Sequence, residues 1–295
     1  MLETHQVDEF NDRGFLVVPG ALEDGDFASV RRKIGRAVEL HAQQLHEAGK
    51  TSSSYQDLPV DERLLQICLE EKGDERISWL WNRQIFGLEI YELLTHPALL
   101  DIVESLIGPE IVVNGDYWLR FKPPNESSEF PWHQDSIYYN GNRRPEGFEH
   151  VPTEQTTILT LWIPMVDVDE NNGCIEIAGG SHKHGLREYE SNDWNRKLPV
   201  EDVSELGEIQ FVPLMAGDVL AFHNLTFHRS GLNRGDGIRW SIDLRYAQTG
   251  APLDWFYYSW PGFVARSETA PESVEPFEVW EKRRAVVEER RARSS

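Results

Sequence analysis

The chain has 295 residues, of which 40% are hydrophobic and 27% charged, enough to bury a sizeable core. Its 50 acidic and 29 basic residues give a formal net charge of -21, so the phosphates of a nucleic acid would on average be repelled. No run of about 18 uncharged apolar residues occurs, and the first residues contain no apolar stretch after a basic start. We therefore expect no nucleic-acid partner, no membrane span and no secretion.

The two cysteines, Cys68 and Cys174, lie far apart and outside any Cys-x-x-Cys motif. Such use of cysteine is typical of a reducing compartment and predicts a cytoplasmic location. It also excludes a thiolate zinc site of the usual spacing, so a metal would be held by histidine and carboxylate.

The N-terminal part, residues 1–110, is predicted to be mainly helical. Residues 9–20 contain a helix end, a short apolar strand and a Pro-Gly turn. Apolar side chains then recur with a period near 3.6, which predicts helices in residues 27–49, 61–71 and 87–110. The last of these is expected to break around His96 and Pro97, and to end at Gly108.

Residues 111–250 form short runs rich in Val, Ile, Trp, Tyr and Thr, separated by turn residues, which predicts strands. The predicted strands are residues 111–122, 130–139, 155–166, 173–180, 209–214, 218–223 and 239–248. Short strands after a helical part favour a mainly β fold with flanking helices, a jelly-roll core. No repeat or linker divides the chain, so we expect a single domain, residues 1–295, in which residues 251–295 form a C-terminal flap and helix.

Two intervals, residues 140–155 and 183–206, are too long and polar for tight turns. We expect them to be loops over the mouth of a site.

His133 and Asp135 are the first sign of a metal site. In a strand, residues two apart point to the same face, so one ion could bind both side chains. A His-x-Asp pair alone is a weak signal, and in isolation a surface pair on a strand is the better interpretation.

A non-haem Fe(II) centre of the facial type needs two imidazoles and one carboxylate on one side of the ion. The third ligand would come from another strand, and both His223 and His228 are candidates. Arg239, on the following strand, could donate a fork of hydrogen bonds to a dicarboxylate. Its alternative role is a structural ion pair with Asp236 or Asp243.

Beyond these residues, whole blocks of the chain resemble the phytanoyl-CoA dioxygenase-like family of Fe(II)/2-oxoglutarate oxygenases. The matching blocks, in family order, are GFLVVPG, ALLDIVESLIGPEI, FKPP, WHQD, LTLWIPMVDVDENNGCIEIAGGSHKHG and GDVLAFHNLTFHRSGLNR. The resemblance covers nearly the whole chain and implies a double-stranded β-helix with a metal near one open end.

The resemblance also implies roles for single residues. The metal ligands would be His133, Asp135 and His228, because Ser230 and Arg239 follow His228 at the family spacing. His223 would then be a strand residue beside the site or in the core. The residues implied to bind 2-oxoglutarate are Arg239, at its distal carboxylate, with Ser230, Ser241, Trp162 and Gln134. Trp162 could equally be a core residue.

The reaction implied is oxidation of a substrate by O2 with Fe(II) and 2-oxoglutarate, which releases succinate and CO2. Hydroxylation is the expected outcome, and Asp135 argues against halogenation, because halogenating relatives have Gly or Ala at the carboxylate position. Oxidative ring closure and desaturation use the same centre and stay open, as does, more remotely, a non-catalytic jelly-roll binding module. His182 and His184 resemble a second metal pair, but family members commonly have a turn there.

The substrate is the least predictable part. Tyr138, Tyr139, Trp118 and Arg120 could line its pocket, and the aromatic residues 251–263 could cover it or the core. With no basic cluster near the triad, we expect a small metabolite or natural-product intermediate. The protein is expected to be a monomer or a homodimer.

Overall fold

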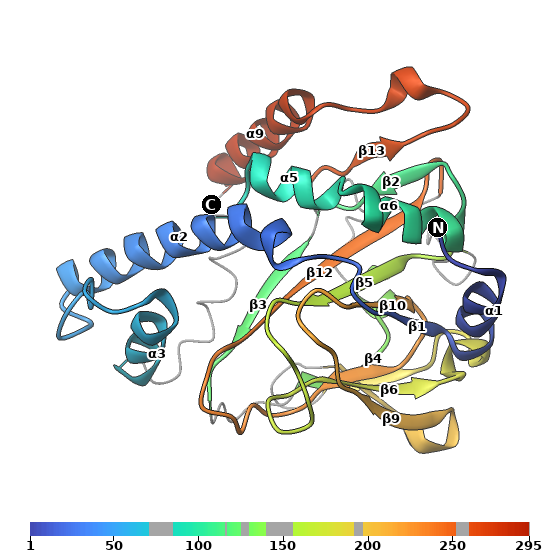
Figure 1. Ribbon diagram of the computed structural model, residues 1–295, viewed down its shortest axis with the longest axis horizontal. Helices are drawn as coiled ribbons and strands as arrows, with labels where there is room; N and C mark the ends of the chain where they lie inside the picture. Colours follow the sequence, from blue (N-terminus) through green and yellow to red (C-terminus); the bar gives the residue numbers. More distant parts are fainter. Residues whose placement is uncertain are drawn as a thin grey trace.

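Figure 1 shows the computed structural model of the protein. It describes residues 1–70, 85–115, 117–124, 130–139, 156–191, 197–251 and 260–294. The predicted loop 140–155 lies outside these residues, as does most of the predicted flap 251–263.

Two antiparallel sheets form the centre of the molecule, as the sequence predicts. The larger sheet has the order β1 (Phe15–Val18), β10 (Val219–His223), β5 (Leu159–Pro164), β12 (Arg239–Gln248), β2 (Ile111–Val113) and β13 (Phe263–Arg266), and β3 (Trp118–Lys122) also pairs with β12. The smaller sheet has the order β4 (Phe130–His133), β11 (His228–Ser230), β6 (Ile175–Gly179) and β9 (Glu208–Val212). A separate ribbon joins β7 (Tyr189–Ser191) to β8 (Lys197–Pro199). The mainly β fold with flanking helices is confirmed.

Helices cover the outer face of the larger sheet (Figure 1). The longer helices are α1 (Thr4–Arg13), α2 (Ala28–Glu47), α3 (Val60–Glu70), α5 (Leu88–Leu94), α6 (Pro97–Ile107) and α9 (Phe277–Ser294). The predicted break at Pro97 is confirmed: Pro97 begins α6, where its missing N–H leaves no hydrogen bond unmade. Gly108, with a φ of 90°, follows the last residue of α6 as predicted.

The larger sheet packs on the helices through its outer face. Leu161 of β5, Ala221 of β10 and Leu244 of β12 share one apolar core with helical residues such as Val38 and Val103. The ring of Trp280 in α9 joins the same core, and the hydroxyl of Tyr246 on β12 donates to the Leu94 carbonyl of α5 at 3.0 Å. Burial of this apolar surface stabilises the sheet against the helices.

The inner face of the larger sheet looks toward the smaller sheet. One part of the space between them is apolar and is filled by Phe15, Trp162, Ile177, Leu220 and Phe222 among others. The other part is lined by buried polar and charged side chains of β12, β3 and β4. The candidate site lies in this polar part.

Two predicted strands are interrupted or end early in the structure. The predicted strand 111–122 is divided into β2 and β3, and the predicted strand 130–139 ends at His133. Beyond it the chain turns at Asp135 and forms the short helix α7 (Ser136–Tyr139), where the Ser136 N–H donates to the Asn224 carbonyl at 3.1 Å. The predicted loop 183–206 contains β7, β8 and a 3-10 turn at Val203–Glu205 in its described residues.

Candidate metal centre

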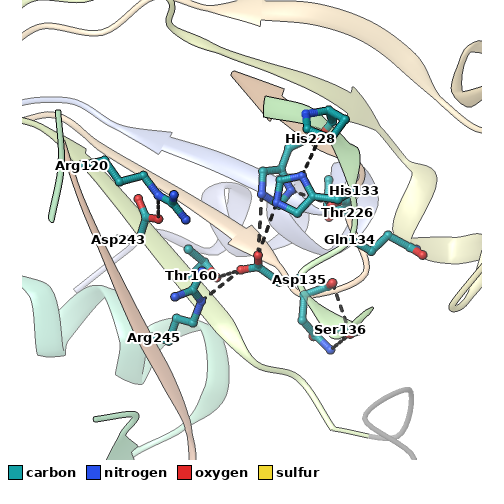
Figure 2. Close-up of polar contacts among 12 residues, drawn as sticks. Arg120, His133, Gln134, Asp135, Ser136, Thr160, Thr226, His228, Asp243 and Arg245 are labelled. Carbon is teal, nitrogen blue, oxygen red and sulfur yellow. Dashed lines mark hydrogen bonds and ion pairs between the residues drawn. The ribbon is translucent and has the colours of Figure 1, made fainter. Parts of the chain in front are cut away.

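His133, Asp135 and His228 come together inside the molecule. His133 ends β4 and His228 begins β11, and the antiparallel register of these strands places the two residues opposite each other. Their ring centroids are 4.1 Å apart. Asp135 lies in the turn after β4, and its Oδ1 is 3.8 Å from the Nε2 atom of each histidine (Figure 2). All three side chains are buried, with ligand atoms within 4.8 Å of one another.

The Nδ1 atom of each histidine is held by the backbone. His133 Nδ1 lies 2.9 Å from the Pro131 carbonyl, and His228 Nδ1 lies 3.0 Å from the Thr226 carbonyl. A carbonyl oxygen only accepts, so each Nδ1 carries the proton and each Nε2 presents its lone pair. Burial lowers the pKa of both histidines, that of His133 well below its usual value, which keeps the imidazoles neutral.

Asp135 is held as a carboxylate. Its Oδ2 accepts hydrogen bonds from Thr160 Oγ1 at 2.7 Å and Arg245 Nε at 3.2 Å (Figure 2). Burial would raise the pKa of Asp135, but the Arg245 guanidinium, together with the hydrogen bond from Thr160, holds the pKa below its ordinary value. These contacts leave Oδ1 directed at the histidines.

The donor set fits a metal ion. At 3.8 Å, neither Nε2 is hydrogen-bonded to Asp135 Oδ1, so two imidazole lone pairs and a carboxylate oxygen converge without satisfying one another. Two histidines and one carboxylate are the ligand set of non-haem Fe(II) oxygenases, and hydrogen bonds to the remote Nδ1 and Oδ2 atoms are the usual means of orienting such ligands.

His223, the other candidate ligand, lies outside this cluster at the end of β10. Its Nδ1 accepts the Leu225 N–H at 3.1 Å, so in the neutral ring the proton is on Nε2, which lies 3.4 Å from Thr157 Oγ1. Burial and the neighbouring His182 lower the pKa of His223 to about 4. Both ring nitrogens of His223 therefore contact groups of the protein, the Leu225 N–H and the Thr157 hydroxyl.

Arg239, at the start of β12, is buried and forms a forked contact. Its Nη1 donates to Ser241 Oγ at 2.5 Å and its Nη2 donates to Ser230 Oγ at 3.0 Å. The guanidinium lies over the Trp162 ring at 5.6 Å, while that ring packs in the apolar core between the sheets. Asp243, the suggested ion-pair partner of Arg239, binds Arg120 Nε at 2.8 Å through its Oδ2.

Gln134 departs from the prediction that it lines the cosubstrate pocket. Although it lies between His133 and Asp135, its side chain points away from them (Figure 2). Its Nε2 donates to the Gly185 and Leu225 carbonyls at 2.8 and 2.7 Å, and its Oε1 accepts the Arg187 N–H at 3.0 Å. Because the chain turns after β4, this amide anchors the loop around residue 185 instead.

The predicted substrate residues fall into two groups. Trp118 and Arg120 lie two apart on β3, and the Arg120 guanidinium lies over the Trp118 and Phe130 rings at 5.2 and 5.3 Å. Tyr138 and Tyr139 follow Asp135 in α7, but their side chains lie outside the described part of the chain.

His182 and His184 are in a short 3-10 helix, Ser181–His184. His184 is exposed, and His182 Nε2 lies 3.1 Å from the Asn11 carbonyl. They do not join the cluster of His133, Asp135 and His228.

Sequence reasoning missed Arg245 and Thr160, which hold Asp135. Arg245 could have been found, because it continues the alternation of Arg239, Ser241 and Asp243 along one face of β12. Thr160 gives no such signal, since a Thr on a buried strand is ordinary.

Comparison with known proteins decides the family. The model of the phytanoyl-CoA dioxygenase (PhyH) family matches residues 10–241. The chain belongs to this family. PhyH-family proteins are Fe(II)/2-oxoglutarate-dependent oxygenases, so the enzyme class and the cofactors Fe(II), 2-oxoglutarate and O2 predicted from the sequence are confirmed, as is a small-molecule substrate.

Two relatives in sequence and one solved structure are similar to this chain. The peroxisomal phytanoyl-CoA dioxygenase of Bos taurus is 25% identical over 260 residues, 84% of this chain and 69% of that protein. The 1-deoxypentalenic acid 11-beta-hydroxylase of Streptomyces exfoliatus is 28% identical over 169 residues, 52% of this chain and 55% of that protein. The solved structure of the non-heme monooxygenase ThoJ shares the fold, with a TM-score of 0.63 and 19% identity over 98% of this chain and 96% of that one.

Among the described residues, no helix has the length and apolar character that a membrane span requires.

Proposed function

We propose that this PhyH-family protein hydroxylates a C–H bond of a small metabolite or natural-product intermediate, with His133, Asp135 and His228 as the ligands of Fe(II). The observation that supports this is the convergence of the Nε2 atoms of both histidines on the Asp135 carboxylate. Each Nε2 atom lies 3.8 Å from Asp135 Oδ1. When bound, Fe(II) supplies the activation of O2 that is coupled to 2-oxoglutarate decarboxylation.

The residues around the triad have distinct tasks in this proposal. Arg239 binds the distal carboxylate of 2-oxoglutarate, and the Ser230 and Ser241 hydroxyls fix the angle of its guanidinium. The Trp162 ring packs beneath the Arg239 guanidinium. Thr160 and Arg245 keep Asp135 charged and aimed at the histidines.

The substrate side of the site would include Trp118 and Arg120, which lie on the inner face of β3, and Tyr138 and Tyr139 from α7. Of the relatives, the Streptomyces exfoliatus protein is named as a 1-deoxypentalenic acid 11-beta-hydroxylase, which supports hydroxylation as the reaction. The mass of the product distinguishes these reactions: hydroxylation adds one oxygen atom, whereas ring closure or desaturation by the same centre removes two hydrogen atoms.

We further propose that the protein acts as a single domain in the cytoplasm, as a monomer or homodimer, without a nucleic-acid partner. The presence of only two cysteines, Cys68 and Cys174, and the net charge of -21 support this assignment.

The test is a screen of small metabolites for succinate release with Fe(II), ascorbate, O2 and 2-oxoglutarate. We expect one chemical class to raise succinate release above that of His133→Ala, and its product to gain one oxygen atom. His223→Asn is the matched control, because it alters a histidine outside the triad and should keep the activity. Release no greater than that of His133→Ala across a broad panel would favour a non-catalytic binding module instead.

A further inference from the structure

Lys122 is a buried lysine at the end of β3, opposite Arg239 in the register of β3 and β12. Only 7% of its surface is exposed. Its ammonium donates to the Gly231 carbonyl at 2.6 Å and to Ser230 Oγ at 3.2 Å, and lies 3.5 Å from the Ser230 carbonyl. Burying an ammonium group costs desolvation free energy, and a second cation nearby adds repulsion. We therefore expect Lys122 to have a function at this position.

Ser230 Oγ receives two donors at once. Lys122 Nζ lies 3.2 Å from it and Arg239 Nη2 lies 3.0 Å from it. A hydroxyl has two lone pairs and one proton, and neither an ammonium nor a guanidinium can accept. Because both lone pairs are used, Ser230 Oγ can form a further hydrogen bond only by donating its proton. In the structure its acceptor is the Gly173 carbonyl oxygen, 3.5 Å from Oγ, which is a long hydrogen bond.

Two cations around one hydroxyl make a site for an anion. Lys122 and Arg239 repel each other across Ser230, and a carboxylate at this position would offset that repulsion while accepting the Ser230 proton. A hydrogen bond to a charged group contributes more than a neutral one, so the orientation of this proton has an energetic consequence.

We propose that Lys122 is a positioning residue for 2-oxoglutarate: it directs the Ser230 hydroxyl proton at the distal carboxylate and adds a second positive charge there. This inference rests on the proposed function of the site. Lys122 thereby selects 2-oxo acids with a second carboxylate over 2-oxo acids of similar length without one.

The test is equilibrium binding of 2-oxoglutarate to the Fe(II)-loaded protein without O2, by isothermal titration calorimetry. Lys122→Met should weaken 2-oxoglutarate binding by about 10-fold or more. The distal carboxylate loses a neighbouring positive charge, and the Ser230 hydroxyl is no longer oriented to donate to it. Binding of 2-oxopentanoate, which lacks the distal carboxylate, should change little. Lys122→Arg, which keeps the charge, should restore part of the affinity, and Lys183→Met is the matched control at an exposed lysine.

A second comparison separates positioning from mere structural support. In a Ser230→Ala background, Lys122→Met should cost much less than in the wild type, because the hydroxyl through which it acts is absent. If Lys122→Met does not fold, Lys122→Gln, which can still donate to the Gly231 carbonyl, replaces it.

Three outcomes are decisive. Unchanged 2-oxoglutarate affinity in a folded, iron-loaded Lys122→Met protein would overturn the inference, and so would an equal loss for both 2-oxo acids. If the wild-type protein itself does not bind 2-oxoglutarate when loaded with Fe(II), the proposed function fails rather than the role of Lys122.

Discussion

The two faces of β12 are both buried, yet their side chains differ completely. The outer face presents Trp240, Ile242, Leu244 and Tyr246 to the helices. The inner face presents Arg239, Ser241, Asp243 and Arg245 to the space between the sheets. Every residue from Arg239 to Tyr246 is buried, so exposure to solvent does not explain the alternation.

The difference shows what each face contributes. Burying the outer face is favourable by itself, because apolar surface leaves water. Burying the inner face is costly unless each charge is compensated, and here Arg245 binds Asp135 and Asp243 binds Arg120. We infer that the outer face stabilises the fold and that the inner face is retained for the site.

The largest expected effect is loss of the metal when a ligand is removed. His228→Ala should abolish stoichiometric Fe(II) binding, because one of two imidazole donors disappears. His223→Asn should keep its iron, since the asparagine oxygen can still accept the Leu225 N–H. Iron content of the purified variants, measured by mass spectrometry, is the test. Retention of iron by His228→Ala together with its loss from His223→Asn would reverse the assignment of this segment.

The metal cluster itself illustrates how far sequence reasoning reaches. Spacing and family resemblance predict His133, Asp135 and His228, and the structure brings them together. The reason given for the first pair was wrong, however, because β4 ends at His133 and Asp135 lies in a turn. The strand is ended by long-range contacts, such as that of the Ser136 N–H with the Asn224 carbonyl, which no local pattern reveals.

The same limit applies to Gln134. The family resemblance implies that it lines the cosubstrate pocket, but its amide is held by Gly185, Arg187 and Leu225. These partners are distant in sequence. Helices and the alternation of β12 were predictable because their periodicity is local, whereas the hydrogen-bond partners of single polar side chains depend on the finished fold.

The next effect in size concerns the outer face. Leu244→Ala should lower the free energy of unfolding by about 2–5 kcal/mol, because it leaves a cavity in the core shared with the helices. Its Fe(II) affinity should remain that of the wild type at temperatures where the variant is folded. Denaturant titration gives the first quantity and Fe(II) titration the second. An iron affinity that falls in step with stability would show that the two faces are not separable.

The smallest effect comes from Arg245, the neighbour of Leu244 on the inner face. Arg245→Met removes the cation that most strongly lowers the pKa of Asp135, so Fe(II) affinity should fall roughly 10- to 100-fold, as for other residues that orient metal ligands. The sign of the pH effect follows. With its pKa raised, Asp135 takes up a proton at a higher pH, and iron binding should be lost at a higher pH than in the wild type as the pH falls.

Arg229→Met is the matched control for this change. Arg229 follows His228 on β11 and forms a comparable ion pair with Glu176 at 2.6 Å, but its guanidinium lies over the Trp132 ring, away from Asp135. Its removal should leave both the affinity for Fe(II) and the pH dependence unchanged. If Arg245→Met behaved like Arg229→Met, the buried charges of β12 would be structural, and the division between its two faces would be one of packing alone.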